Sequence, residues 1–166
     1  MSQDQAVAEL LAKQAITEQI YRYCRAMDRI DNDLGKTVWH ADGLADYGSI
    51  FQGAGHEFIE WVAIGHSTTA GHSHQVSNIL IEVSGDTATS EAYVTAALRR
   101  RADGRLVQMT IRGRYLDRWS RREGRWAIDK RRYVHDFDDV REITEISREG
   151  WSARDRSDPL YSLAAG

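Results

Sequence analysis

The chain changes its hydrophobic period once, about halfway along its length. Residues 4–29 repeat apolar side chains at spacings of three and four, which is the period of a helix with one buried face. The repeated positions are Val7, Leu10, Leu11, Ile16, Ile20, Cys24 and Met27. Asp31, Asn32, Asp33 and Gly35 follow as turn formers, so we predict one long amphipathic helix over 4–29.

Shorter elements are expected between residues 36 and 66. We predict a helical turn over 36–41 and a short two-stranded turn over 45–58, where Gly53 and Gly55 supply permissive backbone. A second helix is predicted over 56–66. One side of this helix carries Phe58, Ile59, Val62 and Ala63.

The second half of the chain alternates with the period of strands over 75–84, 87–101, 105–120 and 125–137. Asp103-Gly104 and Glu123-Gly124 lie between such runs and predict hairpins. Helices followed by an antiparallel meander indicate an α+β fold in a single domain over 1–166. From about residue 140 to 166 we expect a short helix and then an irregular arm, docked through Trp151 and Leu160.

Several predicted strands are apolar on both faces. The run after Gly104 has Val107 and Met109 on one face and Leu106 and Leu116 on the other. We therefore expect a curved sheet with helices over one face and a second subunit partly covering the other. Closed by the first helix, such a sheet leaves a cone-shaped cavity.

Composition excludes some classes of partner. The 166 residues are 42% hydrophobic and 28% charged, which is ordinary for a soluble globular domain. The net charge of −3 gives no general attraction to nucleic acid or to acidic membranes. No signal peptide and no run of 18 apolar residues is visible, and Cys24 has no partner for an internal disulfide. We therefore expect a cytoplasmic protein.

Asp28 and His74 are the candidate catalytic residues. A carboxylate that orients an imidazole makes a compact proton-transfer device, but these two residues are 46 positions apart. The competing interpretation is a solvated Asp28 in the last helical turn and a surface histidine. His72 and His74 could form a metal-binding pair, but no carboxylate follows at close spacing, so we expect no metal. The other histidines are expected to be structural or exposed, with His135 as the exception.

The order of the elements resembles the cone fold of the nuclear transport factor 2-like superfamily, in its SnoaL-like branch. The resemblance covers roughly residues 8–138 and includes hexachlorocyclohexane dehydrochlorinase, scytalone dehydratase and bile acid 7α-dehydratase. In these lyases an aspartate of the first helix pairs with a histidine before the first long strand. Ala26-Met27-Asp28 and His74-x-x-x-Asn78 occupy these two positions. The resemblance also implies a homo-oligomer, with a trimer favoured, and no cofactor.

The same resemblance suggests the other residues of the pocket. Lys130-Arg131 matches a segment that supplies an arginine, for an anionic group or a leaving oxygen. Strict alternation from Trp126 and Ile128 places Arg131 on the opposite face, and a solvated rim is its alternative role. Tyr23 replaces a lysine of the dehydrochlorinase, and Tyr47 matches a pocket tyrosine of the bile acid enzyme. Both tyrosines could equally be core aromatics.

Because a phenol can donate to oxygen but carries no charge for a halide, we predict loss of a hydroxyl rather than of chloride. His74 would be the base, oriented by Asp28, and Val94, Ala96 and Met109 would be apolar walls. The predicted function is a cofactor-independent dehydratase acting on a hydrophobic cyclic, steroid-like or aromatic substrate. The alternatives are an isomerase or cyclase of the same fold, and a non-catalytic small subunit or ligand carrier of the ring-hydroxylating oxygenase type.

Overall fold

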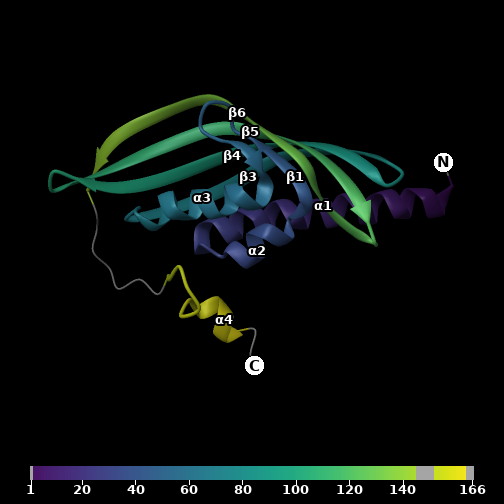
Figure 1. The fold of residues 1–166 in the computed structure, drawn as a ribbon, viewed down its shortest axis with the longest axis horizontal. Helices are drawn as coiled ribbons and strands as arrows, with labels where there is room; N and C mark the ends of the chain where they lie inside the picture. Colours follow the sequence, from purple (N-terminus) through teal and green to yellow (C-terminus); the bar gives the residue numbers. More distant parts are fainter. Residues whose placement is uncertain (1, 145–151, 164–166) are drawn as a thin grey trace.

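The computed structural model describes residues 2–144 and 152–163. A six-stranded curved sheet forms one layer, and the helices α1, α2 and α3 lie against one of its faces (Figure 1). This arrangement confirms the predicted α+β fold with a curved, mainly antiparallel sheet. The core lies between the two layers. Its largest fully buried side chains are Trp39, Trp119, Arg131, Tyr23, Ile16, Ile20, Ile59, Ile128 and Val38.

Helix α1 (Gln3–Arg29) has well-defined ends. Ser2 and Gln5 form a capping box at its start, which pairs two backbone N–H groups that the helix leaves open. Ile30 ends the helix in the left-handed conformation, with φ of 53°. The predicted apolar stripe is buried from Ala12 onward, but Val7, Leu10 and Leu11 are exposed.

The segment after α1 is less helical than predicted. Helix α2 (Asn32–Thr37) begins at an Asp31 cap, and strand β1 (Trp39–Asp46) follows it directly. The helical turn expected over 36–41 is therefore wrong from residue 39, because Trp39 pairs with Ile128 of the sheet. The predicted two-stranded turn is confirmed: β1 pairs antiparallel with β2 (Gln52–Ala54), and α3 (Gly55–Ser67) follows.

Four long strands build most of the sheet: β3 (Gly71–Ser84), β4 (Thr87–Ala102), β5 (Arg105–Arg122) and β6 (Arg125–Ile143). They form the predicted meander within the strand order β2-β1-β6-β5-β4-β3. The turns at Asp103-Gly104 and Glu123-Gly124 have positive φ at both residues, as type I′ hairpins require. Only the β1–β6 pair is parallel among the described strands.

The chain beyond residue 137 differs from the prediction. Residues 140–143 continue β6 and pair with the start of β5, for example Ile143 with Leu106, so the expected short helix does not begin there. A short helix α4 (Pro159–Leu163) follows later and lies on the far side of the helices from the sheet (Figure 1). Trp151 lies outside the described residues.

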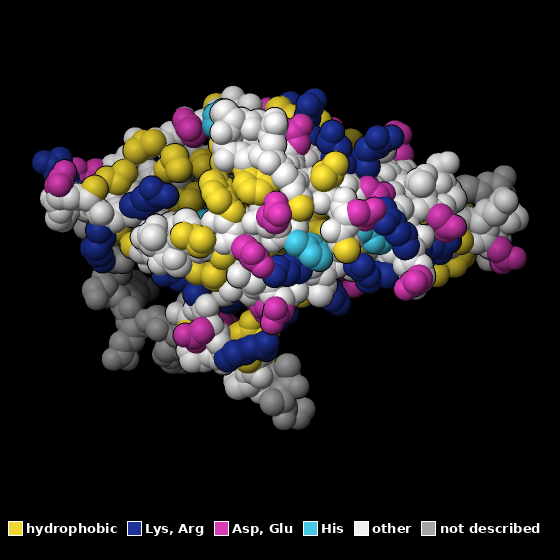
Figure 2. Space-filling view, in the orientation of Figure 1, with side chains coloured by type: hydrophobic (Ala, Val, Ile, Leu, Met, Phe, Trp, Pro, Cys, Tyr) yellow, Lys and Arg dark blue, Asp and Glu magenta, His cyan; other side chains and the backbone are white. Residues whose placement is uncertain are grey.

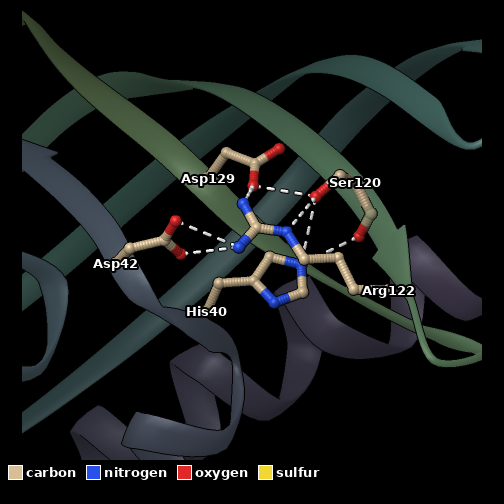
Figure 3. Close-up of polar contacts among 5 residues, drawn as sticks. All are labelled: His40, Asp42, Ser120, Arg122 and Asp129. Atoms are coloured by element: carbon tan, nitrogen blue, oxygen red, sulfur yellow. Dashed lines mark hydrogen bonds and ion pairs between the residues drawn. The ribbon is translucent and has the colours of Figure 1, made fainter.

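A bulge at Asp129 changes which face of β6 points inward. Trp119 pairs with Ile128 and Arg118 pairs with Lys130, so Asp129 is an extra residue with no partner on β5. Side-chain contacts hold it there (Figure 3): Asp129 accepts from Arg122 and from Ser120, at 2.5 Å and 2.8 Å. Because one residue is inserted, Ile128 and Arg131 both face the core. Strict alternation had placed them on opposite faces, which is wrong.

Arg122 connects the bulge to the neighbouring strand β1. It donates to both carboxylate oxygens of Asp42, at 2.8 Å and 3.0 Å, and Figure 3 shows its guanidinium between Asp42 and Asp129. His40 of β1 lies 3.0 Å from the carbonyl oxygen of Ser120. These contacts fix β1 beside the β5–β6 hairpin at the position of the bulge.

Candidate active site

Asp28 and His74 lie in direct contact, although they are 46 positions apart and α2, β1, β2 and α3 lie between them in the chain. The His74 ring donates from Nδ1 to Asp28 Oδ1 at 2.8 Å, and the His74 backbone N–H donates to Asp28 Oδ2 at 3.1 Å. Asp28 comes from the last turn of α1, and His74 lies inside β3 rather than ahead of the strand, opposite Ala96 of β4. One carboxylate therefore holds both the backbone and the ring of His74.

This contact determines the tautomer of His74. A carboxylate oxygen only accepts, so Nδ1 carries the proton, and in the neutral ring Nε2 keeps its lone pair. Within the described residues, Nε2 of His74 has no hydrogen-bond partner. The side chains of His74 and Asp28 are only 8% and 18% exposed. The pair is thus shielded from water and retains one unused basic nitrogen.

His74 forms part of the wall of a cavity of about 650 Å³ between the sheet and helices α1 and α3. This volume lies within the usual range of small-molecule sites. On the face shown in Figure 2, hydrophobic side chains gather where the sheet curves over α3. Apolar cavity walls come from β4 and β5 and include the predicted Val94, Ala96 and Met109 together with Leu98 and Ile111.

Tyr23 and Tyr47 line the same cavity, and their hydroxyl oxygens are 2.7 Å apart. Burial raises the pKa of both phenols above the ordinary value of 10.0. Both are therefore neutral near pH 7. In such a pair one hydroxyl donates to the other, and the second proton remains for another acceptor. The sequence suggested both residues separately, and the structure joins them.

Arg131 does not line the cavity, which differs from the expected contact with a substrate. Its side chain is fully buried and donates from Nε and Nη2 to the two oxygens of Asp117, each at 2.7 Å. The guanidinium lies 4.2 Å from the ring centre of Tyr23 and 4.0 Å from that of Tyr115. Arg131 therefore supports the pocket tyrosines from behind, with its charge already paired.

Two further histidine rings, those of His66 and His72, lie beside the pair. His66 lies 4.3 Å from the ring of His72 and 5.5 Å from that of His74. Burial is the main cause that lowers the pKa of His66 to about 3, so this ring is neutral. His66 also lines the cavity. The sequence did not indicate this, because His66 occupies an ordinary position in a predicted helix. His72 binds Met27 and Thr69, and His135, the expected exception, is exposed at the edge of the cavity.

Three further residues of the site carry no sequence motif. Tyr115 and Tyr133 line the cavity from β5 and β6, where they are paired across the two strands. Asp117 binds Arg131. Alternation from Tyr115 gives Asp117 the same face, and this was the one available signal that a carboxylate points into the core.

The described part of the chain offers neither a metal-binding cluster nor a membrane-spanning helix. Over residues 2–144 and 152–163, no group of three or more His, Cys, Asp or Glu side chains is arranged to hold a metal ion. Both ring nitrogens of His72 are engaged, so the His72–His74 pair is not free for a metal either. In the same part of the chain, no helix is long and apolar enough to cross a membrane.

Comparisons with known proteins agree with this architecture. A family model described as a SnoaL-like domain matches residues 8–132. No curated protein matches the chain. Among solved structures, a scytalone dehydratase-like protein of Novosphingobium aromaticivorans is 22% identical, with a TM-score of 0.71, and the match covers 87% of this chain and 99% of that one.

Two other solved structures are similar over almost their whole length. The hexachlorocyclohexane dehydrochlorinase LinA-type3 of Novosphingobium barchaimii is 17% identical, with a TM-score of 0.70, over 87% of this chain and 99% of that one. A nuclear transport factor 2-like superfamily protein of Salmonella enterica is 22% identical, with a TM-score of 0.66, over 86% and 99%. At these identities the similarity shows a shared fold.

Proposed function

The chain belongs to the SnoaL-like family, and we propose that it is a cofactor-independent lyase that removes water from a hydrophobic cyclic substrate. Structural neighbours of this fold include dehydratase-like and dehydrochlorinase proteins, which supports lyase chemistry in general. Within that class, the choice of a dehydratase depends on the residues of the cavity.

One observation carries the proposal: His74 faces an apolar cavity, and Asp28 occupies its Nδ1. A base must present a lone pair to the substrate, and the Asp28 contact leaves Nε2 for that purpose. When Nε2 takes a proton, the ring becomes an imidazolium, and the adjacent carboxylate stabilises its charge. Asp28 does not need to accept the proton itself.

The proposed reaction begins at a carbon next to a carbonyl or an activated ring. His74 Nε2 removes the proton, and the C–H electron pair forms the new double bond as the β-hydroxyl departs. The hydroxyl leaves as water after taking the imidazolium proton, either directly or through the tyrosine pair, so that His74 and both phenols return to their starting state. The products are water and an unsaturated substrate, so no oxidant or metal is required.

The Tyr23–Tyr47 pair supports loss of oxygen rather than of a halide. A neutral phenol donates a hydrogen bond to a carbonyl oxygen or a departing hydroxyl, which stabilises charge developing on that oxygen. Among the described residues that line the cavity, none is a lysine or an arginine. Arg131 lies behind Tyr23, paired with Asp117, and contributes through the tyrosines.

Two alternatives make different use of the same cavity. An isomerase or cyclase would use the same proton transfer and expel nothing. A non-catalytic small subunit or ligand carrier has no need for a shielded Asp28–His74 contact, so the 2.8 Å distance favours catalysis over this alternative. Co-purification with a larger iron–sulfur subunit would support the small-subunit alternative.

We further propose a homo-oligomer, with a trimer favoured, a hydrophobic small molecule as ligand, and no nucleic-acid or membrane partner. Leu80 and Tyr93 are exposed on β3 and β4, which supports contact between subunits. The single free thiol, Cys24, is buried and fits a cytoplasmic setting. A monomer in sedimentation experiments at micromolar concentration would contradict the oligomer.

The function is tested by incubating the protein with a panel of cyclic β-hydroxy ketones and related hydroxylated steroid-like or aromatic compounds. Mass spectrometry should show a product lighter by one water molecule, formed by wild type and not by His74→Ala. A product of unchanged mass would favour the isomerase. If His74→Ala forms the product as fast as wild type, His74 is not the base.

A further inference from the structure

The C-terminal segment, residues 152–163, contacts the protein close to Asp28 and His74. It lies on the far side of the helices from the sheet (Figure 1). Arg154 donates from Nη1 to the carbonyl oxygen of His66 at 2.9 Å and to the Thr69 hydroxyl at 3.0 Å. Its Nη2 donates to the carbonyl oxygen of Thr69 at 3.1 Å. One guanidinium thus holds the whole turn between α3 and β3.

Thr69 passes this contact to His72. The Thr69 hydroxyl lies 2.8 Å from the His66 carbonyl oxygen and 2.9 Å from His72 Nδ1. On its other side, His72 Nε2 lies 2.9 Å from the carbonyl oxygen of Met27. A carbonyl only accepts, so Nε2 carries a proton. Burial is the main cause that lowers the pKa of His72, so the ring is neutral and Nδ1 is an acceptor.

The Thr69 hydroxyl lies within hydrogen-bond distance of two acceptors, the His66 carbonyl oxygen and His72 Nδ1, and its single proton is shared between them. The His66 carbonyl has another donor in Arg154, at 2.9 Å, whereas Nδ1 has no other donor among the described residues. A hydroxyl turned towards His66 would leave Nδ1 facing an oxygen lone pair. The contacts thus run from Arg154 through the Thr69 hydroxyl to His72 Nδ1, and from His72 Nε2 to the carbonyl oxygen of Met27; we call this series of hydrogen bonds the relay.

The last acceptor matters because Met27 immediately precedes Asp28. The carbonyl of Met27 shares a planar peptide group with the nitrogen and Cα of Asp28. A hydrogen bond to that oxygen therefore orients the plane from which the Asp28 side chain extends. His72 and His74 are two residues apart on β3, so the same strand holds both the carbonyl of Met27 and the carboxylate of Asp28.

We infer that Arg154, Thr69 and His72 are positioning residues for the Asp28–His74 pair, and that the C-terminal segment thereby completes the active site. The effect on turnover rests on the proposed function, whereas the hydrogen bonds do not. Through the hydrogen bonds of the relay, the C-terminal segment does more than pack against the protein: it helps to orient the proposed base. Leu160 of this segment also lines a groove of about 440 Å³ next to Asp28 and His74.

The segment has other anchors, which make a selective test possible. Asp158 lies 3.3 Å from Arg29, and the Tyr161 hydroxyl donates to Asp31 at 3.2 Å. Arg154→Ala should therefore remove the relay while these two contacts keep the segment in place. Arg156→Ala is the matched control, because Arg156 belongs to the same segment and stacks on Tyr161, 4.7 Å from its ring centre.

The first experiment uses the full-length protein and needs no substrate. Nitrogen-15 spectra of the histidine rings should show His72 as the Nε2–H tautomer with a slowly exchanging proton. Arg154→Ala should shift the His72 and His74 ring signals and speed exchange of the His72 proton about tenfold or more, because the ring now opens locally. Arg156→Ala should leave them as in wild type. Unchanged signals in Arg154→Ala would overturn the relay.

The second experiment separates positioning from folding. Thr69→Val removes the hydroxyl at nearly constant size, and Thr69→Ser restores it. Thr69→Val and Arg154→Ala should lower kcat about tenfold to a hundredfold with little change in KM, as expected for small misplacement of a base. Thr69→Ser should recover the kcat of wild type. Equal kcat values for the two Thr69 variants would refute the relay, whereas full activity of His74→Ala would refute the proposed function and leave the ring spectra valid.

Discussion

Asp117 binds Arg131 inside the protein through two parallel hydrogen bonds, each 2.7 Å long, and both side chains are completely buried. This geometry fixes the plane of the guanidinium between the rings of Tyr23 and Tyr115. The third nitrogen, Nη1, has no partner within the described residues. The pair therefore acts as a rigid support beneath the pocket tyrosines.

Removing one member of this pair should destabilise the protein strongly. Arg131→Met leaves the Asp117 carboxylate buried without compensation, which costs about 3–5 kcal/mol of unfolding free energy. Arg131→Met combined with Asp117→Leu should cost less than Arg131→Met alone, because no charge remains inside. Urea denaturation of wild type, Arg131→Met and the double variant measures the three unfolding free energies.

The control for this experiment is Arg114→Met. Arg114 binds Glu91 and Asp136 in the same sheet, but its side chain is 30% exposed, so its loss should cost far less unfolding free energy than the loss of Arg131. If the double variant is as unstable as Arg131→Met, uncompensated charge is not the cause of the loss.

Exchanging either member of the Asp28–His74 pair should abolish most of the proposed activity. His74→Ala removes the base, and Asp28→Asn removes the charge that stabilises the imidazolium. Each should lower kcat/KM by roughly 10²–10⁴-fold while circular dichroism remains that of wild type. Asp33→Asn, an exposed aspartate near the same helix end, should retain full activity. Comparable activity of Asp28→Asn and Asp33→Asn would exclude a catalytic part for Asp28.

The tyrosine pair should contribute to catalysis as a hydrogen-bond donor. Tyr23→Phe and Tyr47→Phe each remove one hydroxyl and interrupt the 2.7 Å contact. Loss of a donor to developing negative charge typically lowers kcat by about 10²–10³-fold. Tyr93→Phe, at an exposed position on β4, is the control. Steady-state kinetics with an identified substrate would contradict the donor role if the pocket variants behave like Tyr93→Phe.

Burial of the pocket phenols predicts an alkaline limit to stability. The pKa is raised for Tyr23, Tyr47, Tyr115 and, to about 12, Tyr133, with burial as the main cause. The unfolded chain loses these protons near pH 10, whereas the folded chain keeps them, so stability should fall as pH rises above about 10. Phenolate absorbance at about pH 11 should increase further when the protein is denatured. Equal absorbance before and after denaturation would contradict this.

His66 should contribute to unfolding in acid. Its pKa is lowered to about 3 in the folded protein, mainly by burial, so between about pH 6.5 and 3 only the unfolded chain binds the proton. Stability from this group is therefore complete above pH 6.5 and decreases as pH falls, by about 2–3 kcal/mol at pH 4.5. His66→Leu should flatten the dependence of urea midpoint on pH between 7 and 4.5. An unchanged slope would show that His66 is not the group responsible.

Local patterns predicted the elements of this fold well, because α1 and the hairpins are encoded by nearby residues. The period of α1 and the glycines at 104 and 124 determine structure within a few positions. Trp39 shows the limit of prediction from local patterns. Its strand pairs in parallel with β6, and no local pattern indicates a partner so distant in sequence. The resemblance to a family, rather than spacing, suggested that Asp28 and His74 meet.

Arg131 shows why the interior of the site was harder to predict. Its face depends on the single inserted residue Asp129, which alternation does not reveal. Its partner, Asp117, is a charged residue in a strand, and such a residue is usually exposed. The buried ion pair could be predicted only if Arg131 and Asp117 were both known to face the core. The proposed role of Arg154 could not be predicted from local patterns either, because Arg154 contacts His66, which lies far from it in the sequence.

The proposed base and the cavity walls come from different parts of the molecule. Asp28 and His74 belong to α1 and β3, whereas Val94, Ala96, Met109 and Ile111 belong to β4 and β5. Substitutions among these wall residues reshape the space offered to a ligand and leave the hydrogen bonds of the base in place. A gene with this architecture can therefore diversify its ligand by point mutation while inheriting the proposed proton-transfer chemistry.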